Sequence, residues 1–173
     1  MSETQFQHCK PSEMSREQFV ERFGEIYEHS AWIAEAVYDE GLDQQCDCVE
    51  TLRQRMEKVL REAATEQQMS LIQAHPDLAG KAAVAGELTS ASTSEQSGAG
   101  IHLCTPEEFE LFNMLNHSYR AKFQFPFIMA VKGSNRHQII AAFERRIHHS
   151  VEEEFKQALI EINKIAEFRL AQC

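Results

Sequence analysis

The clearest limit on the fold of this chain is the spacing of its apolar residues, which recur every three or four positions over most of its length. This spacing places successive apolar side chains on one face of an α-helix. Near the C-terminus, a helix over residues 151–170 would carry an apolar stripe of Val151, Phe155, Leu159, Ile162 and Ala166. Helix formers are abundant and there are 7 glycines in the chain. The sequence therefore predicts an all-α fold.

The length of 173 residues is that of one ordinary domain. Hydrophobic residues make up 43% of the chain, which is enough for a buried core without disulfides or metals. Residues 1–14 are mainly polar, and we expect a frayed N-terminal arm that could fold back through Phe6. Residues 15–173 are expected to form a single-domain helical bundle.

Local signals predict several helix boundaries. Ser15 and Gln18 have the spacing of a capping box, and the apolar pattern behind them fits either one helix ending before Gly41 or two helices broken near His29 and Ser30. The sequence alone does not choose between these two interpretations.

Two further helices have clear limits. A helix over residues 52–63 should continue or restart through residues 69–72 and stop by His75, because the residue before a proline avoids helical backbone. Residues 105–108 combine a capping threonine, a proline at the first helical position and acids in the first turn. Residues 133–135 resemble the start of another helix.

Residues 123–131 interrupt the helical pattern. The run FQFPFIMAV is aromatic, rich in residues that favour β structure and broken by Pro126. We expect it to be a buried extended segment within the helical bundle.

Charge and cysteine content exclude several classes of protein. The formal net charge is −10, so a nucleic-acid partner, which needs a basic surface, is not expected. The 5 cysteines are scattered without a CxxC pair, as in reduced cytosolic proteins. No apolar run of membrane length and no signal peptide are visible. We therefore expect a cytoplasmic protein without membrane partners.

Residues 74–101 combine potential acid, base and hydrogen-bonding groups with small side chains, and we interpret them as the floor and rim of a small-molecule site. Composition alone favours a flexible linker. Against a linker, residues 81–85 can form a turn or two of helix, and Ser92 with Glu95 has capping-box spacing, which predicts a short helix starting at Ser92. His75, with an unperturbed pKa of about 6.5, would suit general acid–base chemistry at neutral pH.

Each candidate residue also has a simpler interpretation. His75 could be a loop histidine bonded to Asp77 or to backbone, and Glu95 could serve as a helix cap, although a capping carboxylate keeps an oxygen for a ligand. Gln96 adds an amide that both donates and accepts. Arg169 continues the inward stripe of the last helix, so its charge must meet an acid of the same protein or an anionic or carbonyl-bearing ligand. A structural ion pair and a ligand role are equally compatible with its position.

Five stretches of the sequence together match one known family. They are AHPDLAGK (74–81), STSEQSGAG (92–100), TPEEFELFNMLNHSYRAKFQFPFIMAVKG (105–133), AAFERRI (141–147) and IAEFRL (165–170). In this combination and order the chain resembles the 2-oxo-4-hydroxy-4-carboxy-5-ureidoimidazoline (OHCU) decarboxylases of purine catabolism. The resemblance implies an all-α, cofactor-free and often homodimeric enzyme that converts OHCU to (S)-allantoin and carbon dioxide.

The resemblance also implies roles for individual residues. The family's catalytic histidine falls on His75, its glutamate on Glu95 and its C-terminal arginine on Arg169, and no metal ligand is implied. Gln124 departs from the glycine that the family commonly has, and Ser97 departs from a frequent alanine. The residues expected to bind or line the substrate pocket are Pro76, Ser92, Gln96, Phe127, Ile128, Met129 and Ala130.

Two other functions remain as alternatives. A non-enzymatic helical adaptor would use residues 82–100 as a hinge, which should be sensitive to proteases. A metal-dependent hydrolase of a ureide would need converging histidine, cysteine or acidic ligands, which the spacing of these residues does not suggest.

Overall fold

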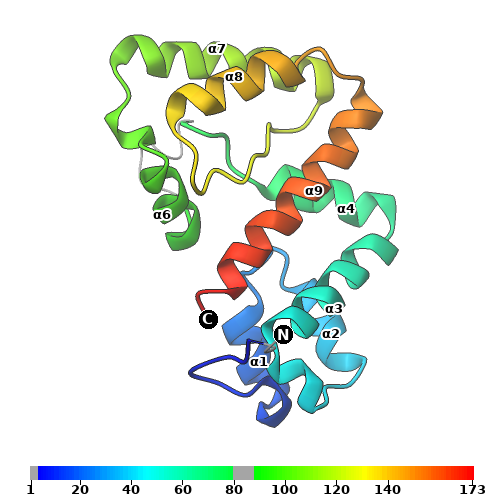
Figure 1. Ribbon diagram of the computed structural model, residues 1–173. Coiled ribbons are helices and arrows are strands. Elements are labelled where there is room, and N and C mark those ends of the chain that lie inside the picture. The colour runs from blue at the N-terminus through cyan, green and yellow to red at the C-terminus, as the bar shows by residue number, and fades with distance from the viewer. Residues whose placement is uncertain (1–3, 80–87) are drawn as a thin grey trace. The chain divides into compact units, whose positions relative to one another are not determined.

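The computed structural model describes residues 4–79 and 88–173 (Figure 1). Helices are the regular secondary structure of these residues, together with one isolated antiparallel bridge between Gln5 and Cys48. The predicted all-α fold is confirmed. The longer helices are α1 Arg16–Phe23, α2 Trp32–Asp39, α3 Val49–Glu62, α4 Thr65–Ala74, α6 Ser90–Gly98, α7 Pro106–Phe123, α8 Arg136–Arg146 and α9 Val151–Leu170. The short 3-10 helices are η1 Pro11–Glu13, η2 Gln44–Asp47 and η3 Ile101–Leu103.

The chain divides into two compact units. The first comprises Met1–Ala74 and Asn163–Cys173, and the second comprises His75–Ile162, so that α9 contributes residues to both. Each unit is described by itself below. The single domain expected over residues 15–173 stays a prediction.

The first unit is built around an aromatic cluster. Phe19 and Phe23 of α1 lie with ring centroids 4.9 Å apart, and Phe6 packs edge-on against Phe23 at 5.5 Å. The backbone N–H of Phe6 also donates to the carbonyl of Asp47 at 3.1 Å. From residue 4 onward, the N-terminal arm therefore folds back onto the unit through Phe6.

The helix boundaries of the first unit follow the local signals. Ser15 and Gln18 form the predicted capping box of α1. The interpretation with two helices is correct, because α1 ends at Phe23 and α2 begins at Trp32. His29, between them, has a φ of +48°, which no helix can include. The apolar pattern after residue 63 restarts as α4, which ends at Ala74 as predicted.

In the second unit, helices α7 and α8 begin at the predicted positions. Thr105 and Glu108 form a reciprocal capping box with Pro106 at the first position of α7, and Asn135 with Gln138 does the same for α8. α7 and α8 are in contact with each other (Figure 1).

Residues 125–131 are neither helical nor paired in a sheet. Phe125, Phe127 and Ile128 are buried, and Phe127 stacks on Phe143 of α8 with centroids 3.7 Å apart. The predicted buried extended segment near residues 123–131 is present from Phe125 onward, whereas Phe123 still belongs to α7 and Gln124 is exposed.

The inward face of α9 differs from the predicted stripe. Val151, expected to be inward, is 48% exposed, whereas Glu154 is 0% exposed. The buried face passes through Glu154, Ala158 and Ile162. The prediction for Val151 was wrong because apolar spacing alone does not reveal a buried carboxylate, and Glu154 is buried in an ion pair with Arg146.

Candidate functional site

The loop with the predicted catalytic histidine begins where α4 ends. α4 stops at Ala74, because Pro76 disfavours helical backbone at the residue that precedes it. His75 is buried despite its place in a loop. A buried imidazole in front of a rigid proline has the restricted mobility that proton transfer to a bound substrate requires.

The capping residue of α6 is not the predicted one. The hydroxyl of Thr89 accepts a hydrogen bond from the backbone N–H of Ser92 at 3.2 Å, so α6 begins at Ser90. The prediction that Ser92 caps this helix was wrong: the run TSASTS offers several equivalent hydroxyls. Glu95 therefore lies inside α6, with Ser92 and Gln96 on the same face.

Gln96 joins α6 to the loop after His75. Its side-chain oxygen accepts from the N–H of Ala79 at 3.0 Å, and its amide nitrogen donates to the carbonyl of Asp77 at 3.4 Å. The structure thus brings the histidine loop and the helix of Ser92 and Glu95 together, although they are separated in sequence. The helical turn predicted for residues 81–85 lies outside the described residues.

The predicted pocket-lining segment, residues 127–130, is held from two sides. The carbonyl of Ile128 accepts from Nη1 of Arg146 at 2.7 Å, and the N–H of Ala130 donates to a carboxylate oxygen of Glu161 at 2.9 Å. Arg146 also lies over the ring of Phe127, 4.2 Å from its centroid.

Arg146 is held in turn by a buried acid. Nε of Arg146 donates to Glu154 at 2.9 Å, the hydroxyl of Tyr119 donates to the same carboxylate at 2.5 Å, and Nδ1 of His149 lies 3.0 Å from it. Burial alone would raise the pKa of Glu154, but hydrogen bonds from Arg146 and Tyr119 outweigh it, and the pKa lies below its usual value. Burial, followed by the bond to Glu154, raises the pKa of Tyr119. The carboxylate is therefore charged and the phenol neutral at pH 7.

Arg146, Glu154 and Glu161 are not among the residues that the sequence predicted for the site. The signal that could have revealed the two glutamates is their seven-residue spacing, which places both on one face of a helix. Arg146 had no such signal, because its partners come from α9 and the segment at 127–130.

Arg169 is buried, as its helical position predicted, and belongs to the first unit. Its Nη1 lies 2.9 Å from a carboxylate oxygen of Glu28 and donates to the carbonyls of Glu25 and Ile26 at 3.2 and 3.4 Å. The ion pair considered for Arg169 is therefore present. The other predicted site residues all belong to the second unit.

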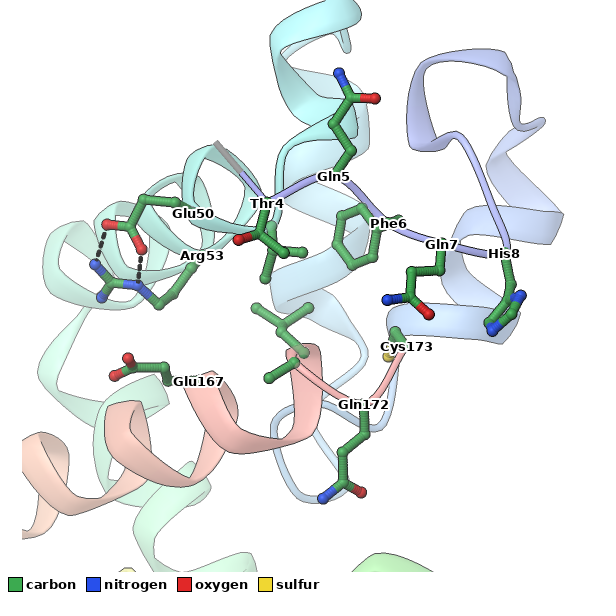
Figure 2. Close-up of a pocket in the computed structure, with 13 residues that line it drawn as sticks. Thr4, Gln5, Phe6, Gln7, His8, Glu50, Arg53, Glu167, Gln172 and Cys173 are labelled. Carbon is green, nitrogen blue, oxygen red and sulfur yellow. Dashed lines mark hydrogen bonds and ion pairs between the residues drawn. The ribbon is translucent and has the colours of Figure 1, made fainter. Parts of the chain in front are cut away.

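A cavity of about 500 Å³ lies in the first unit (Figure 2). It is lined by the N-terminal arm, the start of α3 and the end of α9, and includes Phe6, Val49 and Leu170. Arg53 at its edge is bonded to Glu50 (Figure 2). None of its lining residues is one of the predicted site residues.

Residues 4–79 and 88–173 contain neither a cluster of metal-binding side chains nor a membrane-spanning helix. No three or more histidine, cysteine, aspartate or glutamate side chains converge there as a metal ion would require. In the same ranges, no helix has the length and apolar character needed to cross a membrane.

Comparison with known proteins gives a consistent result. Residues 12–171 match the family model of OHCU decarboxylase. The chain is 44% identical, over 154 residues, to the 2-oxo-4-hydroxy-4-carboxy-5-ureidoimidazoline decarboxylase of Haloferax volcanii, a match that covers 89% of this chain and 88% of the relative.

Two crystal structures are also similar. That of (S)-allantoin synthase is 30% identical with a TM-score of 0.73 and covers 94% of this chain. The match covers 52% of that protein, so this chain spans about half its length. The crystal structure of an OHCU decarboxylase in the presence of (S)-allantoin matches with a TM-score of 0.68 at 20% sequence identity. The match covers 83% of this chain and 91% of that chain, and it shows that the two share a fold.

Proposed function

Because the chain belongs to the OHCU decarboxylase family, we propose that it decarboxylates OHCU to (S)-allantoin and carbon dioxide in urate degradation. The observation that carries this proposal is the family match over residues 12–171. The second unit adds support, because it ties the loop of His75 to the helix of Glu95 through Gln96.

The substrate determines what the site must do. The carbon–carbon bond to the carboxylate breaks and carbon dioxide leaves. The bonding electrons form a C=C bond to the ureido-bearing carbon, and the electrons of its C=N bond pass to the ring nitrogen, which takes up a proton. The 4-hydroxyl then loses its proton to become a carbonyl, and the carbon bearing the ureido group receives a proton. One hand of allantoin forms only if that proton arrives on one face. Orientation of the substrate and delivery of the proton are therefore the main tasks of the protein.

The residues of the second unit suit these tasks. His75 moves the proton on or off the 4-hydroxyl or the reacting carbon, since imidazole exchanges protons near neutral pH. Glu95 and Gln96 hold ureido or ring N–H groups, with Ser92 on the same helical face. Pro76 and the backbone at 127–130 line the pocket. No cofactor takes part in this scheme.

Arg169 holds an oxygen of the substrate in this proposal. We place it on a ring or ureido carbonyl, because a tight pair with the leaving carboxylate would stabilise the ground state along with the transition state and leave the chemical step no faster. Its pair with Glu28 keeps a charged guanidinium buried in the first unit.

Assembly as a homodimer and a cytoplasmic location also belong to this proposal. The family resemblance carries the dimer, and Met114 of α7, 62% exposed, is an apolar side chain that a second copy could cover. Light scattering coupled to size-exclusion chromatography tests the dimer; a monomer at micromolar concentration would contradict it.

The first experiment forms OHCU in situ from urate with uricase and hydroxyisourate hydrolase, adds this protein, and follows allantoin by circular dichroism. We expect a fast rise of (S)-allantoin that His75→Ala and Glu95→Ala abolish, and no loss of rate with EDTA. Slow racemic allantoin from the wild-type protein would refute the proposal. Loss of activity in EDTA would favour the metal-dependent hydrolase instead.

A further inference from the structure

After His75 and Pro76, three backbone polar groups in two consecutive peptide units are held by two buried side-chain amides. Gln96 binds the carbonyl of Asp77 and the N–H of Ala79, as described above. Between them, Nδ2 of Asn116 donates to the carbonyl of Leu78 at 2.9 Å. Gln96 and Asn116 are 5% and 6% exposed. The two amides thus act on one loop from two different helices, α6 and α7.

The loop needs such support because its backbone is strained and buried. Ala79 has a φ of +53°, a left-handed conformation that costs a residue with a Cβ roughly 1 kcal/mol. Leu78 and Ala79 are buried, so their peptide groups cannot turn to water and must find partners inside the protein. Asn116 supplies the partner of the Leu78 carbonyl.

Asn116 is itself rigidly placed. It lies on α7 between Phe112 and Tyr119, both fully buried. Four residues further along the same helix, Nε of Arg120 donates to the side chain of Asp77 at 2.9 Å. One turn of α7 therefore contacts two neighbouring residues of the loop, and a shift of the loop relative to α7 would break both contacts.

The carboxamide of Asn116 is only half used. Its Oδ1 is buried and has no hydrogen-bond partner among the described residues. A buried acceptor without a partner costs about 1–3 kcal/mol. Among the described residues, the hydrogen bond that this carboxamide makes is the one its donor end gives to the carbonyl of Leu78.

We propose that Asn116 is a positioning residue for His75: by holding the carbonyl of Leu78 it fixes the loop that aims the imidazole at the substrate. This inference rests on the proposed function. Asn116 touches neither the reacting atoms nor His75 in this argument; it acts through the backbone. A neutral amide does so without placing a further charge beside the imidazole.

The test replaces Asn116 with leucine, which keeps the branched shape and removes both polar ends, and with serine, a milder neutral change. The matched control is Asn113→Leu, an exposed asparagine one turn earlier on α7. All variants are first checked for folding by far-UV circular dichroism and thermal melting, and are assayed well below their melting temperature.

We expect kcat to fall by about 10-fold or more in the Asn116 variants, with KM changing much less, because a small misplacement of a catalytic group slows the chemical step. The fraction of (S)-allantoin should fall towards racemic as well. Asn113→Leu should match the wild type. NMR titration of the His75 ring should show altered shifts or an altered midpoint in both Asn116 variants and not in the control.

Folded Asn116→Leu or Asn116→Ser protein with unchanged kcat, unchanged enantiomer fraction and an unchanged His75 titration would overturn the inference. A lowered melting temperature with all three unchanged would assign Asn116 a purely structural role. If the wild-type protein fails to act on OHCU, the NMR comparison still separates the outcomes: changed His75 signals retain the positioning role while the proposed function fails.

Discussion

Two backbone stretches of the second unit, the loop at 75–79 and the segment at 127–130, are non-helical and largely buried, yet their backbones are held by different kinds of side chain. Neutral amides of Gln96 and Asn116 hold the backbone of the loop, while Arg120 pairs with the side chain of Asp77. Charged side chains of Arg146 and Glu161 hold the segment. Both arrangements satisfy peptide groups that water cannot reach.

The difference has consequences for stability. A buried charge is costly unless it is paired, so Arg146 requires Glu154, and the removal of either leaves the other unpaired. A neutral amide has a smaller desolvation cost, and its hydrogen bonds are weaker than those of a charged group. We therefore expect the segment at 127–130 to dominate the stability of the unit, and the loop at 75–79 to dominate its catalytic rate.

The largest expected effect comes from Arg146→Met. This change leaves Glu154 as an uncompensated buried charge and removes the donor to the Ile128 carbonyl, so the free energy of unfolding should fall by about 3–5 kcal/mol. Urea unfolding at pH 7 measures it. Arg16→Met, which breaks an exposed pair with Asp39, is the control and should change little. If Arg146→Met and Arg16→Met lowered the free energy of unfolding equally, the buried charge of Arg146 would have no special role in stability.

Acid should weaken the charged support selectively. The pKa of Glu154 is lowered in the folded protein, so its stabilisation is fully present above the unfolded-state pKa of about 4.3 and is lost as pH falls through the folded pKa. In the Glu154→Gln variant, the loss of unfolding free energy that comes from protonation of Glu154 should be absent. Unfolding free energies between pH 7 and 3 test this, with Glu152→Gln, exposed on the same helix, as control. Identical acid profiles for all three proteins would contradict the assignment.

A smaller effect is expected at Glu161. Glu161→Ala removes the acceptor for the Ala130 N–H, and we expect kcat/KM for OHCU to fall by about 10-fold, or 1.4 kcal/mol. Glu161→Gln keeps an oxygen in place, and Gln157, which donates to Glu161 at 3.0 Å, can turn its amide to match. This variant should retain most of the activity. If both variants lose activity equally, the charge matters more than the hydrogen bond.

The smallest effect concerns Gln124, where the family commonly has glycine. Gln124 ends α7 with a φ of +64°, a left-handed conformation that costs roughly 1 kcal/mol. Glycine removes this strain but has more freedom in the unfolded chain, so Gln124→Gly should stabilise the protein by about 0.5 kcal/mol. Gln54→Gly, in the middle of α3, should instead destabilise it by about 1 kcal/mol. Thermal melting distinguishes the two signs.

Much of the fold could be predicted because its signals are local. The capping boxes at Ser15, Thr105 and Asn135 involve side chains and backbone within one turn, so residue identity alone specifies them. The end of α4 before Pro76 and the limits of α9 are equally local. Where several local signals compete, prediction fails: Thr89 and Ser92 are both good caps, and only the packing of α6 selects Thr89.

The sequence by itself determined that the chain is helical, where most helices begin and end, and which family it resembles. The tertiary structure alone decided which groups meet: Asn116 with Leu78, Arg146 with Glu154, and Arg169 with Glu28, a pair 141 residues apart in the chain. Helix periodicity shows that a side chain points inward. The partner that offsets the cost of burying its polar group comes from a distant segment of the chain, and no local pattern encodes that contact.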